Sequence, residues 1–167
     1  DDPERHTIMN RRQFVQNLSS AARLTAAPGT LPLIARAAPS NRLRAGMIGA
    51  SGRAGSLNKY FAANPEVEIA VIAEIDPGRL PGTLEAVTRL QGKKPKTVTD
   101  YRHIIDDSEL DVIVVGTPDH WHAIPTIQAC MTGKDVYVEK PDAHNIVEGQ
   151  RMIAAAKKFK RVIQVGS

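Results

Sequence analysis

The 167-residue chain has little of three features on which common classes of protein depend. Its single cysteine, Cys130, excludes an internal disulfide, and the apolar neighbours Ile127 and Ala129 predict a place in a helix core. Aromatic residues make up 4% of the sequence, too few to stack nucleic-acid bases, and the net charge of +4 comes from scattered Lys and Arg. No apolar run approaches the ~20 residues that span a bilayer. We therefore expect neither a nucleic-acid partner nor a membrane span.

Residues 1–40 differ in composition from the rest of the chain. The length of the whole chain and its 42% hydrophobic content suit one globular core. Arg11 and Arg12 precede an aromatic residue and an alanine-rich stretch that ends in Ala35-Arg36-Ala37. This pattern resembles a twin-arginine export signal with its cleavage site, although Arg23 interrupts the apolar part. An alanine-rich helix or arm is the alternative. We expect a leader and linker, and hence a periplasmic or otherwise extracytoplasmic protein, or a cytoplasmic one if the leader does not function.

A glycine-rich turn follows the first strongly apolar stretch. Residues 43–48 are predicted to form a buried strand, and Gly49-Ala50-Ser51-Gly52-Arg53-Ala54 leads from it into a helix over 53–63. This order directs backbone N–H groups and the positive end of the helix dipole at one point, where a phosphate would bind. The turn matches the pattern Gly-x-Gly-x-x-Gly/Ala except that Ser51 replaces the second glycine. A turn that merely packs a helix is the alternative.

The dinucleotide pattern also requires a strand that ends in an acidic residue about 20 residues further on. Residues 67–74 form such a strand, and Glu74 lies 20 residues after Ala54. Its carboxylate is predicted to accept the ribose hydroxyls. Glu74 would repel a 2′-phosphate, whereas Arg53 and Arg79 offer cations for one. The sequence therefore predicts NAD as the cofactor, with NADP as the alternative.

Strands and helices alternate after residue 40. Such alternation predicts a doubly wound parallel sheet of the Rossmann type over residues 41–167, with ligands bound beyond the carboxyl ends of the strands. Strands are expected near 43–48, 67–74, 96–98, 111–116, 134–138 and 161–165, and helices near 53–63, 79–90, 100–106, 120–132 and 144–159.

A polar segment, Thr117 to His122, follows the strand at 111–116. Thr117 and Asp119 are suited to cap the next helix, which is the structural alternative to a role in a binding site. His120 and His122 are two residues apart, so on a helix they face different ways and cannot share one metal ion. The sequence therefore predicts no metal site.

Glu139-Lys140-Pro141 follows the strand at 134–138. Pro141 restricts the backbone of Lys140, so that its amine starts from a fixed position at the end of a buried strand. The amine would serve as a general acid or base for a substrate hydroxyl. A surface lysine in a salt bridge with Glu139 is the alternative.

Together the motifs at 49–54, 117–122 and 139–141 resemble the glucose–fructose oxidoreductase, inositol dehydrogenase and MocA (Gfo/Idh/MocA) family, and the resemblance covers residues 43–167. It implies that the turn at 49–54 holds the pyrophosphate and that Glu74 or Asp76 binds the adenosine ribose. It further implies a nicotinamide side lined by Thr117, Pro118 and His122 with Glu139 close by, and an active-site lysine, Lys140, that contacts the nicotinamide ribose and the substrate.

The family implies an oxidoreductase that transfers a hydride between nicotinamide and a hydroxyl-bearing carbon of a sugar, inositol or related compound. It also implies a second α/β domain for the substrate and a homo-oligomer in the full-length protein. Because the sequence ends at Ser167, we expect this chain to be the nucleotide-binding part, inactive alone. The alternatives are an NAD-dependent glycosidase of the same family, which oxidises its substrate transiently, and a non-catalytic nucleotide-binding module.

Overall fold

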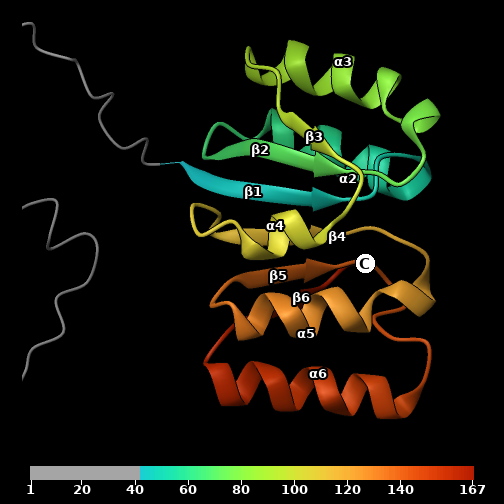
Figure 1. Cartoon of the computed structure of the whole chain (residues 1–167), viewed down its shortest axis with the longest axis vertical. Helices are drawn as coiled ribbons and strands as arrows, with labels where there is room; N and C mark the ends of the chain where they lie inside the picture. Colours follow the sequence, from blue (N-terminus) through green and yellow to red (C-terminus); the bar gives the residue numbers. More distant parts are fainter. Residues whose placement is uncertain (1–41) are drawn as a thin grey trace, which may run out of the picture. The chain divides into compact units, whose positions relative to one another are not determined.

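A six-stranded parallel sheet organises residues 42–167, the part of the chain that the computed structural model describes (Figure 1). Its order is β3-β2-β1-β4-β5-β6, so the predicted doubly wound parallel sheet is confirmed. The predicted leader at 1–40 lies outside the described residues. The strands are β1 (Leu43–Ile48), β2 (Val67–Ala73), β3 (Lys96–Val98), β4 (Val112–Val115), β5 (Asp135–Val138) and β6 (Ile163–Val165).

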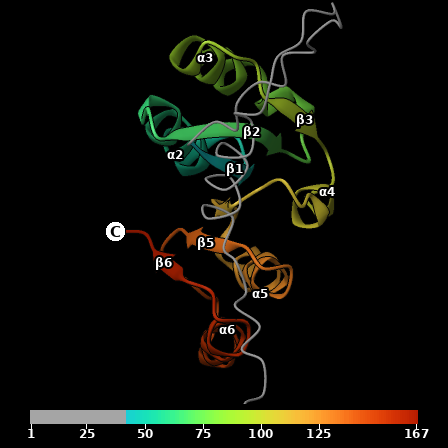
Figure 2. The same cartoon turned by 90° about the vertical axis from the view of Figure 1, so that its left-hand side faces the viewer.

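Helices cover both faces of the sheet, as Figure 2 shows: α2 and α3 lie on one side and α4 and α5 on the other. Leu57 of α2 and Val87 of α3 pack into one apolar core, and Cys130 of α5 lies fully buried in the other, as predicted. Among the described residues, no helix is both long and apolar enough to cross a membrane. The helices are α2 (Gly52–Ala63), α3 (Pro81–Gln91), α4 (Arg102–Asp106), α5 (Ala123–Met131) and α6 (Ile146–Phe159), with short 3₁₀ helices η1 (Pro77–Arg79) and η2 (Asp119–Trp121).

The segment between β4 and α5 differs from its prediction. The single helix expected near 120–132 is divided into η2 and α5, and neither Thr117 nor Asp119 caps α5. The hydroxyl of Thr117 instead donates to the carbonyl oxygen of Trp121, and the carboxylate of Asp119 accepts the next backbone N–H, that of His120. Short-range bonds of this kind compete with helix formation, and they close a separate turn before α5 begins.

Candidate dinucleotide-binding site

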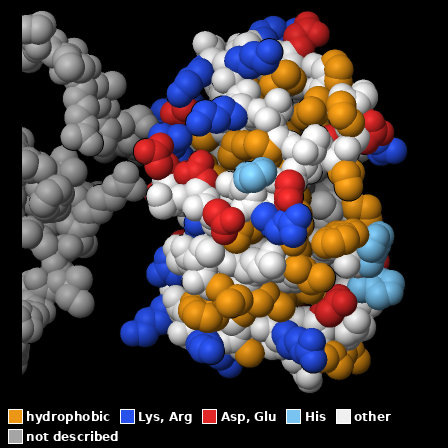
Figure 3. All heavy atoms as spheres, in the orientation of Figure 1, with side chains coloured by type: hydrophobic (Ala, Val, Ile, Leu, Met, Phe, Trp, Pro, Cys, Tyr) orange, Lys and Arg blue, Asp and Glu red, His pale blue; other side chains and the backbone are white. Residues whose placement is uncertain are grey.

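Two adjoining hollows lie at the carboxyl ends of the strands. Residues after β1, β2, β3 and β4 line the larger, a cleft of about 1080 Å³, and residues after β4 and β5 line the smaller, of about 590 Å³. The two share Arg53, Gly116, Thr117 and Pro118. In Figure 3, hydrophobic and histidine side chains gather along the right-hand edge, the side at which the strands of Figure 1 end. Every predicted site residue except Gly52 lines one of these hollows.

The glycine-rich turn is shaped by close packing. Gly49 has a φ of +102°, a left-handed conformation that favours glycine, and a Cβ there would lie 3.0 Å from the Cβ of Ala54. On the other side, a Cβ at Gly116 would lie 2.8 Å from the same Ala54 atom. The start of α2 therefore rests directly on the ends of β1 and β4, which requires small residues at these three positions.

The N-terminus of α2 is open to an anion. Ser51 precedes the helix, but its hydroxyl does not cap it, and the first turn of α2 carries no acidic residue. The Ser51 hydroxyl instead accepts a hydrogen bond from Nη1 of Arg79 at 3.2 Å. Uncapped N–H groups, the helix dipole and a nearby guanidinium suit a diphosphate. Ser51 thus departs from the glycine pattern, but its hydroxyl accepts the hydrogen bond that keeps the Arg79 guanidinium beside the turn.

Glu74 joins this turn to the end of β2. The side chain is buried, its Oε2 accepts the N–H of Ala50 at 2.8 Å, and its Oε1 accepts the N–H of Asp76 at 3.1 Å. A carboxylate has about four acceptor sites, so each oxygen retains one for a ribose hydroxyl.

Asp76 is engaged differently. One oxygen of its exposed carboxylate accepts the N–H of Gly78 at 3.0 Å, and the other accepts Nε of Arg79 at 3.0 Å. Of the two acids that the sequence offered for the ribose, the geometry therefore favours Glu74, while Asp76 orients Arg79. Two cations were considered for a 2′-phosphate, Arg53 and Arg79. Arg79 lies beside Asp76, near the end of β2, whereas Arg53 pairs with Glu139 after β5.

The smaller hollow contains the residues that follow β5. Lys140 is exposed at its wall, and its neighbour Glu139 is buried. The Glu139 carboxylate pairs with Arg53, whose Nε lies 3.0 Å from Oε2, rather than with Lys140 as the alternative interpretation held. Lys140 is therefore free of that pairing and stands beside a hollow that adjoins the larger cleft.

His122 ties together the two loops around this hollow. Its ring is 1% exposed, and its nitrogens Nδ1 and Nε2 each lie 2.7 Å from a backbone oxygen, that of Pro141 and that of Thr117 respectively. The ring thus positions the backbone next to Lys140. Its polar atoms are engaged with protein, although the residue does line the smaller hollow.

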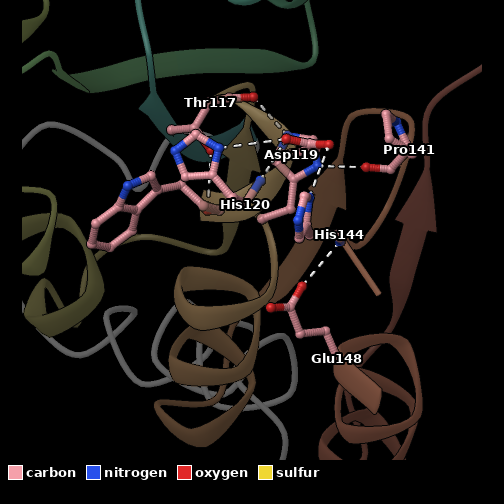
Figure 4. A network of polar contacts seen from close by, with 8 residues as sticks. Thr117, Asp119, His120, Pro141, His144 and Glu148 are labelled. Atoms are coloured by element: carbon pink, nitrogen blue, oxygen red, sulfur yellow. Dashed lines mark hydrogen bonds and ion pairs between the residues drawn. The ribbon is translucent and has the colours of Figure 1, made fainter. Parts of the chain in front are cut away.

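A second, exposed link joins the same loops, as Figure 4 shows. The Oδ2 of Asp119 lies 3.4 Å from Nδ1 of His144, and the backbone N–H of His144 donates to Glu148. The hydrogen bond from His144 lowers the pKa of the Asp119 carboxyl. Asp119 is therefore a loop contact rather than the helix cap that its position suggested.

Several residues of the site were not predicted. Thr83 of α3 donates to the carbonyl of Ala50 at 2.6 Å, and Asn58 of α2 donates to that of Gly49 at 3.0 Å, so two helices fix the glycine-rich turn. Ile75, 85% exposed, lines the cleft, as do the edge-packed rings of Tyr101 and Trp121. The position of Ile75 directly after a strand was a signal available in the sequence, whereas Thr83 and Asn58 lie within helices and gave none.

These features define a class of protein. A parallel sheet, a glycine-rich turn that opens an uncapped helix, and a buried acid at the end of β2 together form a Rossmann domain whose residues fit a dinucleotide. The sequence model described as "Oxidoreductase family, NAD-binding Rossmann fold" matches residues 43–167. The chain therefore belongs to the Gfo/Idh/MocA family, as its motifs indicated, and its cofactor is NAD.

Individual relatives agree with this assignment. A "Glycosyl hydrolase family 109 protein" of Shewanella pealeana is 28% identical, over 92% of this chain and 38% of that protein. The structure of levoglucosan dehydrogenase in complex with NADH is 31% identical with a TM-score of 0.63, over 74% of this chain and 34% of that one. Myo-inositol 2-dehydrogenase from Lactobacillus plantarum is 28% identical with a TM-score of 0.62, over 75% and 36%. The chain thus spans between 34% and 38% of the length of these proteins.

Proposed function

We propose that this chain is the NAD-binding part of an oxidoreductase that acts on a hydroxyl-bearing carbon of a sugar, inositol or related compound. The observation that carries the proposal is the convergence of an open helix N-terminus, the buried Glu74 and the exposed Lys140 at one edge of the sheet. The names of the two solved structures, a levoglucosan dehydrogenase and a myo-inositol 2-dehydrogenase, support this substrate class.

In this proposal each part of the site has one task. The turn at 49–54 would hold the diphosphate, Glu74 the adenosine ribose, and Thr117 and Pro118 the nicotinamide side. NAD supplies a carbon that accepts or returns a hydride when bound. Lys140 would take up or release the proton of the substrate hydroxyl at its Nζ, because it stands free of Glu139 at the wall of the smaller hollow.

A glycosidase that uses bound NAD for a transient oxidation is the second candidate. The name of the Shewanella pealeana relative favours it. Both candidates need the same nucleotide site, so the described residues serve either. They differ in outcome: an oxidoreductase releases reduced cofactor with each turnover, whereas such a glycosidase produces no net NADH.

The proposed cofactor site is tested by thermal unfolding of this chain with NAD and with NADP. A ligand that binds only the folded state raises its stability, by about 2.7 kcal/mol at a hundredfold excess over Kd. We expect a clear rise in Tm with NAD and a smaller one with NADP, because Glu74 would repel the 2′-phosphate. The variant Gly49→Val, strained at a φ of +102°, should show no rise with NAD. No shift with millimolar NAD or NADP would contradict the proposal.

We also propose that the leader directs export. Arg11 and Arg12 are the paired arginines on which this depends. In cells that produce the chain, replacement of both by Lys should retain the protein in the cytoplasm, as measured by cell fractionation. Equal export of the unaltered and the altered chain would refute this assignment.

A further inference from the structure

Arg53 connects the glycine-rich turn to the segment that carries Lys140. Its backbone belongs to the first turn of α2, the expected position of the diphosphate. Its side chain points away from that turn toward β5 and β6: Nε donates to Oε2 of Glu139 at 3.0 Å, and Nη2 donates to a backbone oxygen of Ser167 at 3.2 Å. One residue thus takes part in both halves of the site.

We propose, resting on the function proposed above, that Arg53 is a positioning residue: through Glu139 it fixes the nicotinamide side of the site relative to the diphosphate turn. It would therefore strengthen binding of the nicotinamide end of NAD without itself binding the diphosphate. This differs from the sequence-based expectation, which offered Arg53 as a cation for a 2′-phosphate.

The burial of the Glu139 carboxylate explains why Arg53 remains paired with it. The Glu139 side chain is 5% exposed, Arg53 is its ion-pair partner among the described residues, and its second oxygen, Oε1, is buried without a hydrogen bond. A buried carboxylate that loses its cation is strongly unfavourable. The same pairing raises the pKa of Arg53. The ion pair therefore holds the Nε side of the guanidinium at Glu139.

The end of β6 closes over this pair. A Cβ at Gly166 would lie 2.9 Å from Oε2 of Glu139 and 2.8 Å from the hydroxyl of Tyr137. The carboxylate is thus confined between β5, β6 and the guanidinium of Arg53. A guanidinium can donate from Nε and Nη2 in two directions at once, whereas an ammonium group cannot reproduce this fork. A lysine at this position would keep the positive charge but not this donor geometry.

The inference is tested by comparing two ligands, NADH and ADP-ribose, which lacks the nicotinamide. Isothermal titration of the unaltered chain should show tighter binding of NADH. In Arg53→Met and in Glu139→Gln this preference should fall by roughly tenfold, the equivalent of one lost contact of about 1.4 kcal/mol. The affinity for ADP-ribose should stay within about twofold, because the backbone N–H groups of α2 remain. Arg89→Met, which removes an exposed cation of α3, is the matched control and should bind both ligands normally.

Other outcomes overturn the inference. An equal loss of affinity for both ligands would mean that Arg53 binds the diphosphate directly, and no loss for either, or no preference for NADH in the unaltered chain, would mean that the pair positions nothing. If the unaltered chain binds neither ligand, the proposed function itself fails. If Arg53→Met does not fold, Arg53→Lys carries the test, since it keeps the charge and should still lose the preference for NADH.

Discussion

Replacing His122 by Phe should lower the free energy of unfolding by about 2 kcal/mol, and Tm by roughly 5–10 °C. The ring is 1% exposed, and its two nitrogens lie 2.7 Å from the backbone oxygens of Thr117 and Pro141. Phenylalanine has a ring of similar size, so little cavity forms, but it offers no polar atom to either oxygen. The loss is therefore that of the hydrogen bonding between the two loops, measured by urea unfolding followed by circular dichroism.

A matched control separates this effect from that of any change from His to Phe. His103 of α4 is exposed, and His103→Phe should change the stability by less than about 0.5 kcal/mol. In addition, His122→Phe should weaken NAD binding, because the loops that it joins line the smaller hollow. If His122→Phe unfolds at the same urea concentration as the unaltered chain, the ring does not join the loops in solution.

The fold was predictable because each signal in the sequence is local. β4 is a continuous apolar run, as a strand buried on both sides requires, and Gly92, with a φ of +73°, ends α3 in the left-handed conformation that glycine adopts readily. The segment between β4 and α5 is the exception. The helix expected near 120–132 is split because the side chains of Thr117 and Asp119 form hydrogen bonds with backbone groups inside the turn. Helix propensity alone does not determine whether such bonds form.

The sequence identified which residues line the site better than it identified the contacts between them. The sequence placed Glu139 and Lys140 together at the end of a strand and left a salt bridge between them as the alternative to a catalytic role of Lys140. The carboxylate instead meets Arg53, which is 86 residues away in the sequence. Likewise, the bond between His122 and Pro141 joins two loops whose approach is set by the pairing of β4 with β5. Such contacts follow from the packed sheet, and local spacing does not reveal them.

Glu74→Gln should weaken NAD binding by roughly 10–100-fold, the equivalent of about 1.4–2.8 kcal/mol. The two carboxylate oxygens accept two backbone N–H groups, those of Ala50 and Asp76. Glutamine has a single side-chain oxygen, so its amide NH₂ must face one of these donors within a buried site. The turn should shift at Ala50, and the ribose hydroxyls should lose a charged acceptor, both of which a calorimetric titration with NAD would detect.

Asp76 provides the control for Glu74→Gln. Asp76→Asn makes the same chemical change two residues away, but asparagine can still accept the N–H of Gly78, and only the exposed contact with Arg79 is weakened. We expect less than about a threefold change in the affinity for NAD. A larger loss in Asp76→Asn than in Glu74→Gln would assign the ribose to Asp76. A Glu74 variant that gained affinity for NADP while keeping its affinity for NAD would show that Glu74 excludes the 2′-phosphate without holding the ribose.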